Sequence, residues 1–446
     1  MDPYDALDRA QLLALVRAQA ASLADLTATL KRLEARIRAL ERRGDPGGPR
    51  GMPGLKPAPG PDRPTTPKPR TPRAQGFARA RAVPTATVDH ALDRCPECGT
   101  TLGGGSVKRT REVIDLAPSS VQIIAHRFVE RVCPLCRRRC TPAAQLRDQV
   151  VGRQRLGLGL VSRIVTLREV GRLPVRTIQW YLQTFHALYL SVGTIASLSQ
   201  RVARAATDEV TAIRDQIRAS PAVHADETGW RTDGRNGYIW TFSTPQARYF
   251  LHGRRTKTMV DTALGPDFAG VLLSDFYAAY THYPGLKQRC WAHLLREIHD
   301  LRQVFPNDAA LATWAEAVHA LFVEARDTVH PTPELRALAA GRYRQRLLEL
   351  VRPVAGDPEA PARQLSARLE RFIGDLFVFV TEPGVAPTNN LAERSLRPLV
   401  TRRKISGGSR SPAGTAATMT LASLFGTWLL QDQNPYTACR DLLTRA

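Results

Sequence analysis

The chain has 446 residues, 43% of them apolar, so it can bury a substantial core and wholesale disorder is excluded. Its 63 Lys and Arg residues against 41 Asp and Glu give a net charge of +22, which a small-metabolite enzyme rarely needs; this excess favours a polyanionic partner, nucleic acid first and an anionic membrane surface second. Because no apolar run approaches the roughly 18 residues of a spanning helix and residues 1–5 lack signal-peptide features, we expect a soluble cytoplasmic protein with no membrane partner.

Residues 1–43 are predicted to form a helix with an apolar seam. Leu, Val and Ile recur at spacings of three and four from Leu12 to Leu40, with Gln19 as the polar seam position. This period predicts a leucine-zipper-like coiled coil and therefore a homo-oligomer; the alternative is an amphipathic helix folded back on its own chain. Residues 44–90 are basic and rich in proline, which predicts an extended linker, either a solvated tether or a nonspecific phosphate contact.

Residues 91–150 contain two C-x-x-C pairs and are predicted to form a zinc-binding domain. The pairs are Cys95 with Cys98 and Cys133 with Cys136. Each pair can supply one edge of a tetrahedron, so the two together complete a closed, structural four-thiolate zinc site. Residues 111–116 and 121–129 alternate as strands do, which predicts a zinc ribbon. A redox dithiol is the alternative, but no thioredoxin-like pattern surrounds the pairs.

Residues 151–219 have a helical pattern. One helix is predicted to start at Leu173-Pro174-Val175, and Ser191 is positioned to cap a second helix. Two helices around such a turn resemble a helix-turn-helix, with Arg201 and Arg204 as candidate DNA contacts. Any other helical hairpin would give the same pattern.

From residue 220 to 430 the pattern predicts an α/β catalytic core. Strands are expected at 222–228, 237–243 and 248–252, then a helix at 256–264 and a buried strand at 270–275. Three meandering strands, a helix and a strand beside the first is the order of the ribonuclease-H-like fold.

Two aspartates end neighbouring strands of this predicted core. Because the first and fourth strands are adjacent in the ribonuclease-H-like fold, Asp226 and Asp275 are expected to face each other. Two such carboxylates repel, and a divalent cation, magnesium or manganese, removes that penalty. The alternative is that each aspartate only caps the following turn.

A third acid, Glu393, is followed by a basic run. Asn390-x-x-Glu393 also has the spacing of a capping box, so Glu393 has a structural alternative. A basic run beside a metal carboxylate suits a phosphodiester substrate, and Gly407-Gly408-Ser409 would let backbone amides approach a phosphate. The candidate DNA contacts here are Arg394, Arg397, Arg402, Arg403 and Lys404.

Between the last core strand and Glu393, a mostly helical insertion is expected at about residues 300–385. Its predicted helices are 311–325, 334–351 and 364–379, and residues 431–446 are expected to be a C-terminal tail. Cys290 and His293 precede the insertion at a spacing of three. We expect a packing or DNA-positioning role for them; the alternative, a metal-ligand pair, lacks an evident second pair.

Four motifs, in this order, resemble the insertion-sequence 66 family of transposases. They are HADETGWR at 224–231, SDFYAAY at 274–280, CWAHLLR at 290–296 and TNNLAER at 388–394. The resemblance covers nearly the whole chain, and the order of zipper, zinc segment, helix-turn-helix and core also matches. It implies an Asp-Asp-Glu triad at Asp226, Asp275 and Glu393. The basic block at 402–409 departs from the family because it lacks the aromatic residues common there.

The resulting expectation is a nucleoid-associated DNA transposase. It would cleave the ends of an insertion element and join their 3′ ends to target DNA by two-metal phosphodiester chemistry, with companion transposition proteins as further partners. The competing hypotheses are a metal-dependent nuclease of the same fold and a DNA-binding regulator with a vestigial catalytic core. Joined products separate the first hypothesis from the other two.

Overall fold

The computed structural model describes residues 83–84, 86–111, 121–142, 146, 148–150 and 155–445. The predicted coiled coil at 1–43 and most of the predicted linker at 44–90 lie outside the described residues. The chain divides into two compact units, Met1–Ala117 and Pro118–Ala446.

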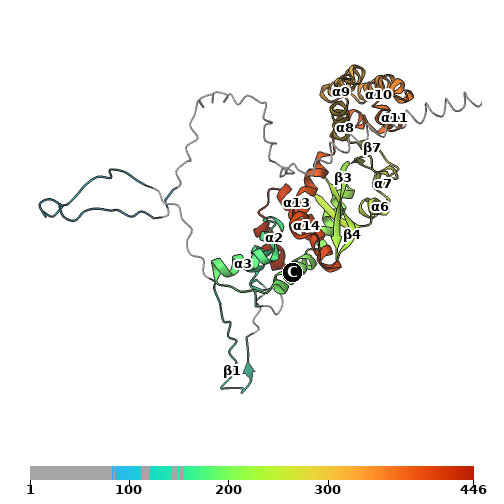
Figure 1. Cartoon of the computed structure of the whole chain (residues 1–446). Helices are drawn as coiled ribbons and strands as arrows, with labels where there is room; N and C mark the ends of the chain where they lie inside the picture. Colours follow the sequence, from blue (N-terminus) through green and yellow to red (C-terminus); the bar gives the residue numbers. More distant parts are fainter. Residues whose placement is uncertain are drawn as a thin grey trace, which may run out of the picture. The chain divides into compact units, whose positions relative to one another are not determined.

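A five-stranded mixed sheet forms the centre of the second unit's described part (Figure 1). Its order is β5-β4-β3-β6-β7; the first three strands of this sheet, β3, β4 and β5, pair antiparallel, whereas β6 and β7 run parallel to β3. The first and fourth strands are therefore neighbours, as predicted, and the mixed α/β architecture fits a ribonuclease-H-like core. The strands are β3 (Ala222–Thr232), β4 (Arg235–Ser243), β5 (Arg248–Gly253), β6 (Val271–Ser274) and β7 (Lys287–Arg289).

Strand alternation gives β3 two different faces. Val223 and Ala225 point into the main hydrophobic core together with Trp240 and Phe242 of β4. This core also contains residues from the helices that directly precede β3, so the predicted helix-turn-helix region, 151–219, packs on the sheet. The helices on this side include α2 (Leu158–Glu169), α3 (Val175–His186), α4 (Val192–Ala205), α5 (Thr207–Arg218) and α6 (Thr258–Leu264), and a short helix α7 (Ala278–Thr281) follows β6.

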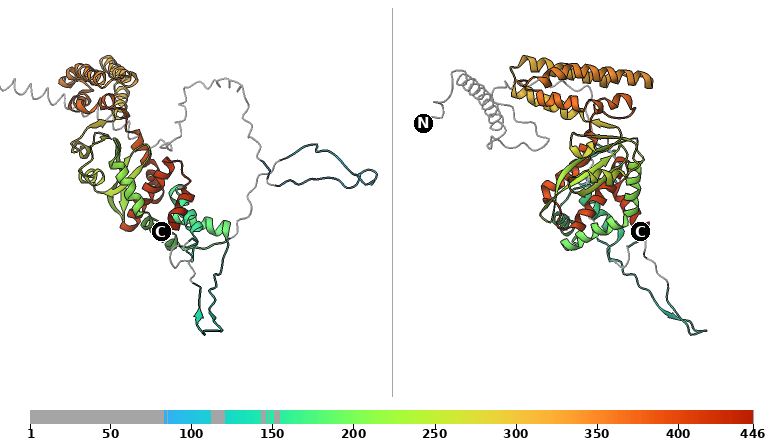
Figure 2. Two further views of the ribbon diagram at one scale, coloured as in Figure 1. Left: turned by 180° about the vertical axis from the view of Figure 1, so that it is seen from behind. Right: turned by 90° about the vertical axis from the view of Figure 1, so that its right-hand side faces the viewer.

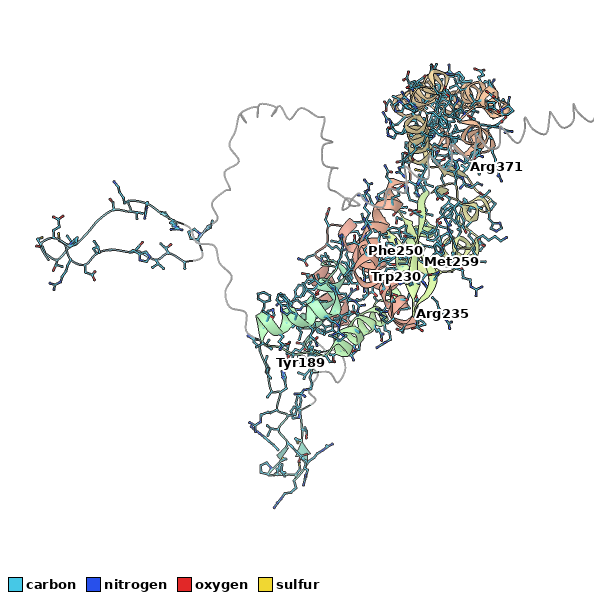
Figure 3. The ribbon with its side chains drawn as sticks, viewed as in Figure 1. Tyr189, Trp230, Arg235, Phe250, Met259 and Arg371 are labelled. Atoms are coloured by element: carbon cyan, nitrogen blue, oxygen red, sulfur yellow. The ribbon has the colours of Figure 1, made fainter. Side chains whose placement is uncertain are left out.

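The other face of β3 packs against α13 (Asn390–Ser406). Trp230 and Phe250 from the sheet contact Leu396 and Leu399 of α13, and both aromatic side chains lie against the sheet in Figure 3. Residues of β3 with even numbers share this face. Helix α13 is thus held beside the strand that carries Asp226.

The predicted helical insertion is a separate bundle, residues 291–389 in the structure, standing beyond one end of the sheet (Figure 2). Its core is built around Trp291, which stacks near Phe322 and Phe377 at 4.9 and 5.4 Å between ring centres. The third predicted helix, 364–379, instead ends at Arg371, because the chain turns there to bring Phe377 into this core. Its elements are α8 (Trp291–Val304), α9 (Ala309–Asp327), α10 (Pro333–Gly356), α11 (Arg363–Arg371), η1 (Ile373–Asp375) and α12 (Val378–Thr381).

Two more helices complete the core at its C-terminal end, α14 (Pro412–Leu430) and α15 (Pro435–Arg445). Among the described residues, α14 is the one helix long and apolar enough to cross a membrane, although the sequence suggested no such run. It is a core helix: Leu421, Leu424 and Phe425 are buried in the main core. The segment expected to be a tail forms α15, because Leu442 and Leu443 are also buried in this core.

Candidate active site

Asp226 and Asp275 lie where the parallel pairing of β3 with β6 ends, Asp226 within β3 and Asp275 just after β6. His224 of β3 is paired with Leu273 of β6, and each aspartate lies two residues farther along its strand direction. Neighbouring strands are about 4.8 Å apart, so the register places the two carboxylates beside each other. The pairing of β3 with β6 therefore supplies the geometry that the sequence could only suggest.

Glu393 joins the two aspartates from the first turn of α13. Burial, together with charge repulsion from Glu227, Asp275 and Glu393, raises the pKa of Asp226 to about 7. The three predicted acids, which come from three separate segments, are therefore close enough to repel one another. Such a cluster is unfavourable unless a proton or a cation neutralises it.

The sequence left open that each acid only caps the local backbone; the two aspartates do make such hydrogen bonds, whereas Glu393 does not form its capping box. Asp226 Oδ1 accepts the Glu227 amide and Asp275 Oδ1 accepts the Tyr277 amide, both at 2.9 Å, so each aspartate does brace the following backbone. One carboxylate oxygen remains on each. The capping box of Glu393 is not formed, because α13 begins at Asn390 and its N-cap is Asn389, which makes no side-chain cap hydrogen bond within the described chain.

Asn389 is a site residue that sequence reasoning missed. Its side chain is 1% exposed, its Nδ2 donates to Ala225 O at 2.7 Å, and its Oδ1 lies 3.2 Å from His224 Nδ1. Burial lowers the pKa of His224 to about 4, so its neutral ring donates to Asn389. Asn389 thereby ties the start of α13 to β3, one residue from Asp226. The signal was present in the motif TNNLAER, where only Glu393 was singled out.

A fourth acid, Glu227, is held away from the triad. Its side chain, 3% exposed, pairs with Arg255 at 2.7 Å, and Tyr280 Oη donates to its other oxygen at 2.5 Å. Glu227 points to the opposite face of β3 from Asp226. Because both of its oxygens have partners, Glu227 is a structural acid, and the doublet Asp226-Glu227 gave no sign of this division of roles.

Arg289 of β7 fixes the loop that carries Asp275. The guanidinium is 0% exposed; its Nη1 donates to Asp275 O at 2.7 Å and to Ser274 Oγ at 3.1 Å. Its Nε lies 3.3 Å from Asp375 Oδ2 in the insertion. A buried arginine of this kind is stable only when its donors are satisfied. Neither β7 nor Arg289 was identified from the sequence.

The predicted DNA contacts after Glu393 fall into two groups. Arg394, Arg397 and Lys404 are exposed on α13 and free to meet a phosphate. Arg402 is instead 13% exposed and pairs with Glu169 of α2 at 2.8 Å. Arg403 donates to Thr228 Oγ1 at 3.0 Å and to the Gly229 carbonyl, so both of these arginines hold α13 in place.

The other predicted DNA contacts divide similarly. Arg204 is exposed at the end of α4, whereas Arg201 is half-buried; Ser191 caps α4 as predicted, accepting the Thr194 amide at 3.0 Å. Of the two glycines after α13, Gly408 packs on protein, because a Cβ there would lie 2.2 Å from Arg231 O, whereas a Cβ on Gly407 would meet nothing within 4 Å. Gly408 therefore allows close backbone approach to β3, where the sequence suggested approach to a phosphate.

The two cysteine pairs adopt the same turn, each in its own unit. The amide of the first cysteine donates to the carbonyl five residues on, and its carbonyl accepts the amide four residues on, all at 2.9 Å. Hydrogen bonding by Thr100 lowers the pKa of Cys98 to about 7, and backbone hydrogen bonding near Cys136 lowers that of Cys133. Stabilised thiolates are what a zinc knuckle requires. The pair in the second unit is flanked by β1 (Arg131–Val132) and β2 (Arg139–Cys140), whereas the strand expected at 121–129 is absent from the described structure.

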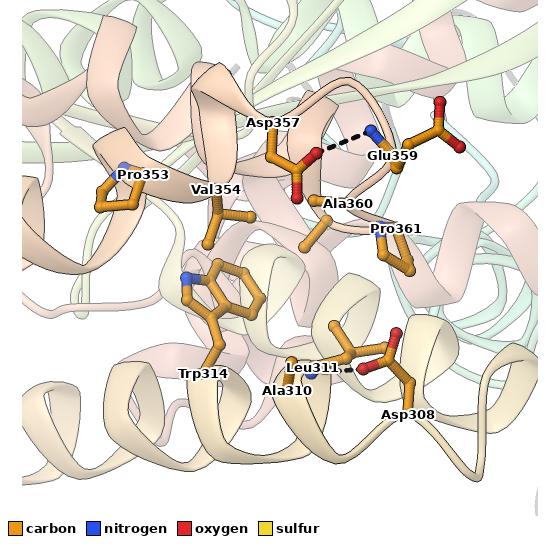
Figure 4. Close-up of a pocket in the computed structure, with 11 residues that line it drawn as sticks. Asp308, Ala310, Leu311, Trp314, Pro353, Val354, Asp357, Glu359, Ala360 and Pro361 are labelled. Carbon is orange, nitrogen blue, oxygen red and sulfur yellow. Dashed lines mark hydrogen bonds between the residues drawn. The ribbon is translucent and has the colours of Figure 1, made fainter.

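A pocket of about 350 Å³ lies in the insertion, between α9 and the end of α10 (Figure 4). Leu311, Trp314 and Val354 supply apolar walls. The acids at its rim brace backbone: Asp308 accepts the Leu311 amide and Asp357 the Glu359 amide, at 2.8 and 2.9 Å. This pocket has none of the predicted site residues, so the acid cluster is the better candidate for chemistry.

We expect Asp226→Asn to stabilise the metal-free protein at pH 8. The pKa of Asp226 rises from 3.8 to about 7 on folding. Between about pH 4 and 7 the folded state holds a proton that the unfolded chain has lost, so stability falls across that window and stays low above it. Thermal melts in EDTA should show a higher midpoint for the variant at pH 8 and a smaller gap at pH 5. Asp261→Asn, at an exposed carboxylate, is the control; a gap independent of pH would contradict the prediction.

Comparison with known protein families identifies a match. A protein-family model described as "Transposase IS66 family" matches residues 153–417, which is more than half of the chain. The matched range includes helices α2–α5, all three acids and the insertion. A search of curated proteins finds no match.

Proposed function

This chain belongs to the IS66 family of transposases, and from that premise we propose that it cleaves the ends of an insertion element and joins their 3′ ends to target DNA. Family membership implies action on DNA. The specific chemistry is our proposal, and the observation that supports it most is the charge repulsion that Asp275 and Glu393, from two other segments, exert on Asp226.

The three acids suit hard divalent cations. Asp226 has a pKa raised first by burial and then by its acidic neighbours, and Glu393 Oε1 is buried with no hydrogen-bond partner in the described structure. Carboxylate oxygens in this state are the ligands that magnesium and manganese prefer. When bound, two such ions would activate the attacking oxygen and stabilise the leaving oxygen of a phosphodiester. The raised pKa of Asp226 reflects burial and repulsion among the acids, and a bound cation would relieve that repulsion.

The protein's own residues would position the DNA and the acids. Exposed Arg394, Arg397 and Lys404 follow Glu393 on α13, where they can contact phosphates beside the reacting bond. Arg204 on α4 would supply a further contact in the helix-turn-helix region. Asn389 would fix the position of Glu393 through its hydrogen bond to Ala225 O, and Arg289 would fix the position of Asp275 through its hydrogen bond to Asp275 O. The net charge of +22 favours DNA binding that weakens as salt increases.

The remaining segments complete the proposal. Cys95, Cys98, Cys133 and Cys136 would bind one structural zinc, with each pair already in a knuckle turn. The heptad seam of residues 1–43 would pair protomers, because two element ends must be held together. Companion transposition proteins are further proposed partners.

The test is incubation of the full chain with labelled element-end DNA, target plasmid and magnesium. We expect nicked ends first and then joined products, and we expect both to disappear with EDTA. Nicked DNA without joined products would favour the metal-dependent nuclease. Binding without either product would favour the vestigial regulator. A sequence-scrambled end of equal length is the matched control for specificity.

A further inference from the structure

Two polar atoms are buried without a partner where the insertion meets the core. They are His293 Nδ1 on α8 and Glu393 Oε1 on α13, and neither makes a hydrogen bond to any described residue. Buried polar groups are nearly always paired, so an unpaired group needs an explanation, such as an ion. Two such atoms on facing side chains point to one shared ligand.

A buried thiol lies beside them. Cys290 is 1% exposed at the N-cap of α8, and His293 is in the first turn of the same helix. His293 Nε2 lies 3.7 Å from Glu393 Oε1, too far for a hydrogen bond. One ligand atom from each of Cys290, His293 and Glu393 can be chosen so that all three lie within 4.8 Å of one another.

We propose that Cys290, His293 and one carboxylate oxygen of Glu393 bind a single transition-metal dication of the zinc class. Thiolate, imidazole and carboxylate are the ligand types of such a cation, and three protein ligands with water in the fourth position form a recognised zinc geometry. Ligand atoms around a tetrahedral zinc are about 3.3 to 3.7 Å apart, so small side-chain rotations close the site. Binding replaces the thiol S–H bond with an S–metal bond, and the proton passes to solvent.

This site differs from the magnesium site of the proposed function. It depends on a sulfur and a nitrogen donor, which magnesium disfavours. The two sites share Glu393, whose second oxygen remains available to the aspartate pair. The proposal stands on the three side chains alone and holds whether or not the protein joins DNA ends.

The alternative is that Cys290 and His293 only pack, as the sequence suggested. Cys290 does have a packing contact, because its Sγ accepts the Asn389 amide at 3.1 Å. Packing leaves His293 Nδ1 and Glu393 Oε1 unsatisfied, however, whereas a cation bound by these two atoms satisfies both; a His293–Glu393 ion pair through Nε2 would still leave Nδ1 without a partner among the described residues. The absence of a second Cys-x-x-His pair ceases to be an objection once Glu393, about 100 residues later, supplies the third ligand.

A cation here would clip both ends of the insertion together. The chain leaves the core at Cys290 and returns at Asn389, and the Trp291 amide donates to Pro387 O at 3.1 Å across the same junction. Closing a long loop by a metal removes conformational freedom from the unfolded chain. The clip would also set the orientation of Glu393 before DNA binds.

The test uses the full chain with Cys95, Cys98, Cys133 and Cys136 replaced by serine, so that the knuckle zinc is removed. After dialysis against cobalt and then metal-free buffer, we expect about one cobalt per chain and a thiolate-to-cobalt absorption band. Adding Cys290→Ser should abolish the band, and His293→Ala should weaken cobalt affinity at least about tenfold. Cys439→Ser, at the other buried cysteine, is the matched control and should leave both signals unchanged.

Several outcomes overturn the proposal. One is that the four-serine protein retains no cobalt while its circular dichroism shows a folded core. Another is that Cys290→Ser and Cys439→Ser bind cobalt equally. Asp226→Asn with Asp275→Asn separates the two sites: it should eliminate cleavage yet keep the absorption band. Loss of the band in that double variant would place the cobalt in the aspartate cluster and refute a Cys-His-Glu site.

Discussion

Replacing Asp226, Asp275 or Glu393 by its amide should lower DNA cleavage by at least about a thousandfold, because each change removes a group acting in the transition state. Asn and Gln keep the size and part of the hydrogen bonding of the acids, but they remove the negative charge that binds a hard cation. Binding of element-end DNA should stay within about twofold at fixed salt, because the phosphate contacts are made by other residues.

The measurement pairs single-turnover cleavage with a binding isotherm for each variant. Asp261→Asn is the matched control, since this carboxylate is 55% exposed on α6 and its ion-pair partner is the exposed His282. Near-normal cleavage by any one of the three variants would remove that residue from the proposed triad. A parallel loss of DNA binding would instead show that the acid supports the DNA-binding surface.

Arg289→Ala should cost about 3–5 kcal/mol of folding free energy, the usual effect of breaking a buried charged network. The change removes the donor to Asp275 O and to Ser274 Oγ, and it leaves Asp375 without its cation. The loop that carries Asp275 also loses its anchor, so cleavage should fall even at temperatures where the protein stays folded.

Urea unfolding of Arg289→Ala and Arg302→Ala tests this expectation. Arg302 pairs with Glu316 at 3.4 Å with both side chains well exposed, so its loss should cost less than about 1 kcal/mol. Equal midpoints for the two variants would contradict the assigned role of Arg289. Restoration of stability by Arg289→Lys would show that charge alone suffices. We expect Lys to fail because it cannot reach Asp275 O, Ser274 Oγ, Asp375 Oδ2 and Thr281 Oγ1 at once.

The sequence predicted the sheet well where the pattern repeats over several residues. The strand that carries Asp226 and the strand before Asp275 are alternating and apolar runs, and their adjacency followed from their order, although β3 continues past the predicted end to Thr232. The three-residue strand Lys287–Arg289 has no such pattern, and it was missed together with Arg289. Short strands are recognisable only from the neighbours they pair with.

Side-chain roles were harder to predict than positions. Arg394 and Arg402 are equivalent in the sequence as members of one basic run, yet Arg394 is exposed and Arg402 is buried against Glu169. The difference comes from which side of α13 faces the core, and Glu169 lies more than 200 residues earlier in the chain. Asn389 was overlooked for a similar reason, because its partners His224 and Ala225 are remote in sequence.

The insertion begins and ends at two neighbouring points, Cys290 and Asn389. The length of the insertion therefore does not determine the distance between the acids that flank it. The chain departs and returns at points joined by one N–H···S hydrogen bond of 3.1 Å, so whatever lies between them adds no distance between Asp275 and Glu393. The outer helices α9 and α10 can therefore be shortened or lengthened while the carboxylates keep their places, whereas the segment around Asp375 must be kept because it pairs with Arg289 and packs on β6. For protein engineering, the loop between α9 and α10 is the natural point at which to graft a new targeting domain.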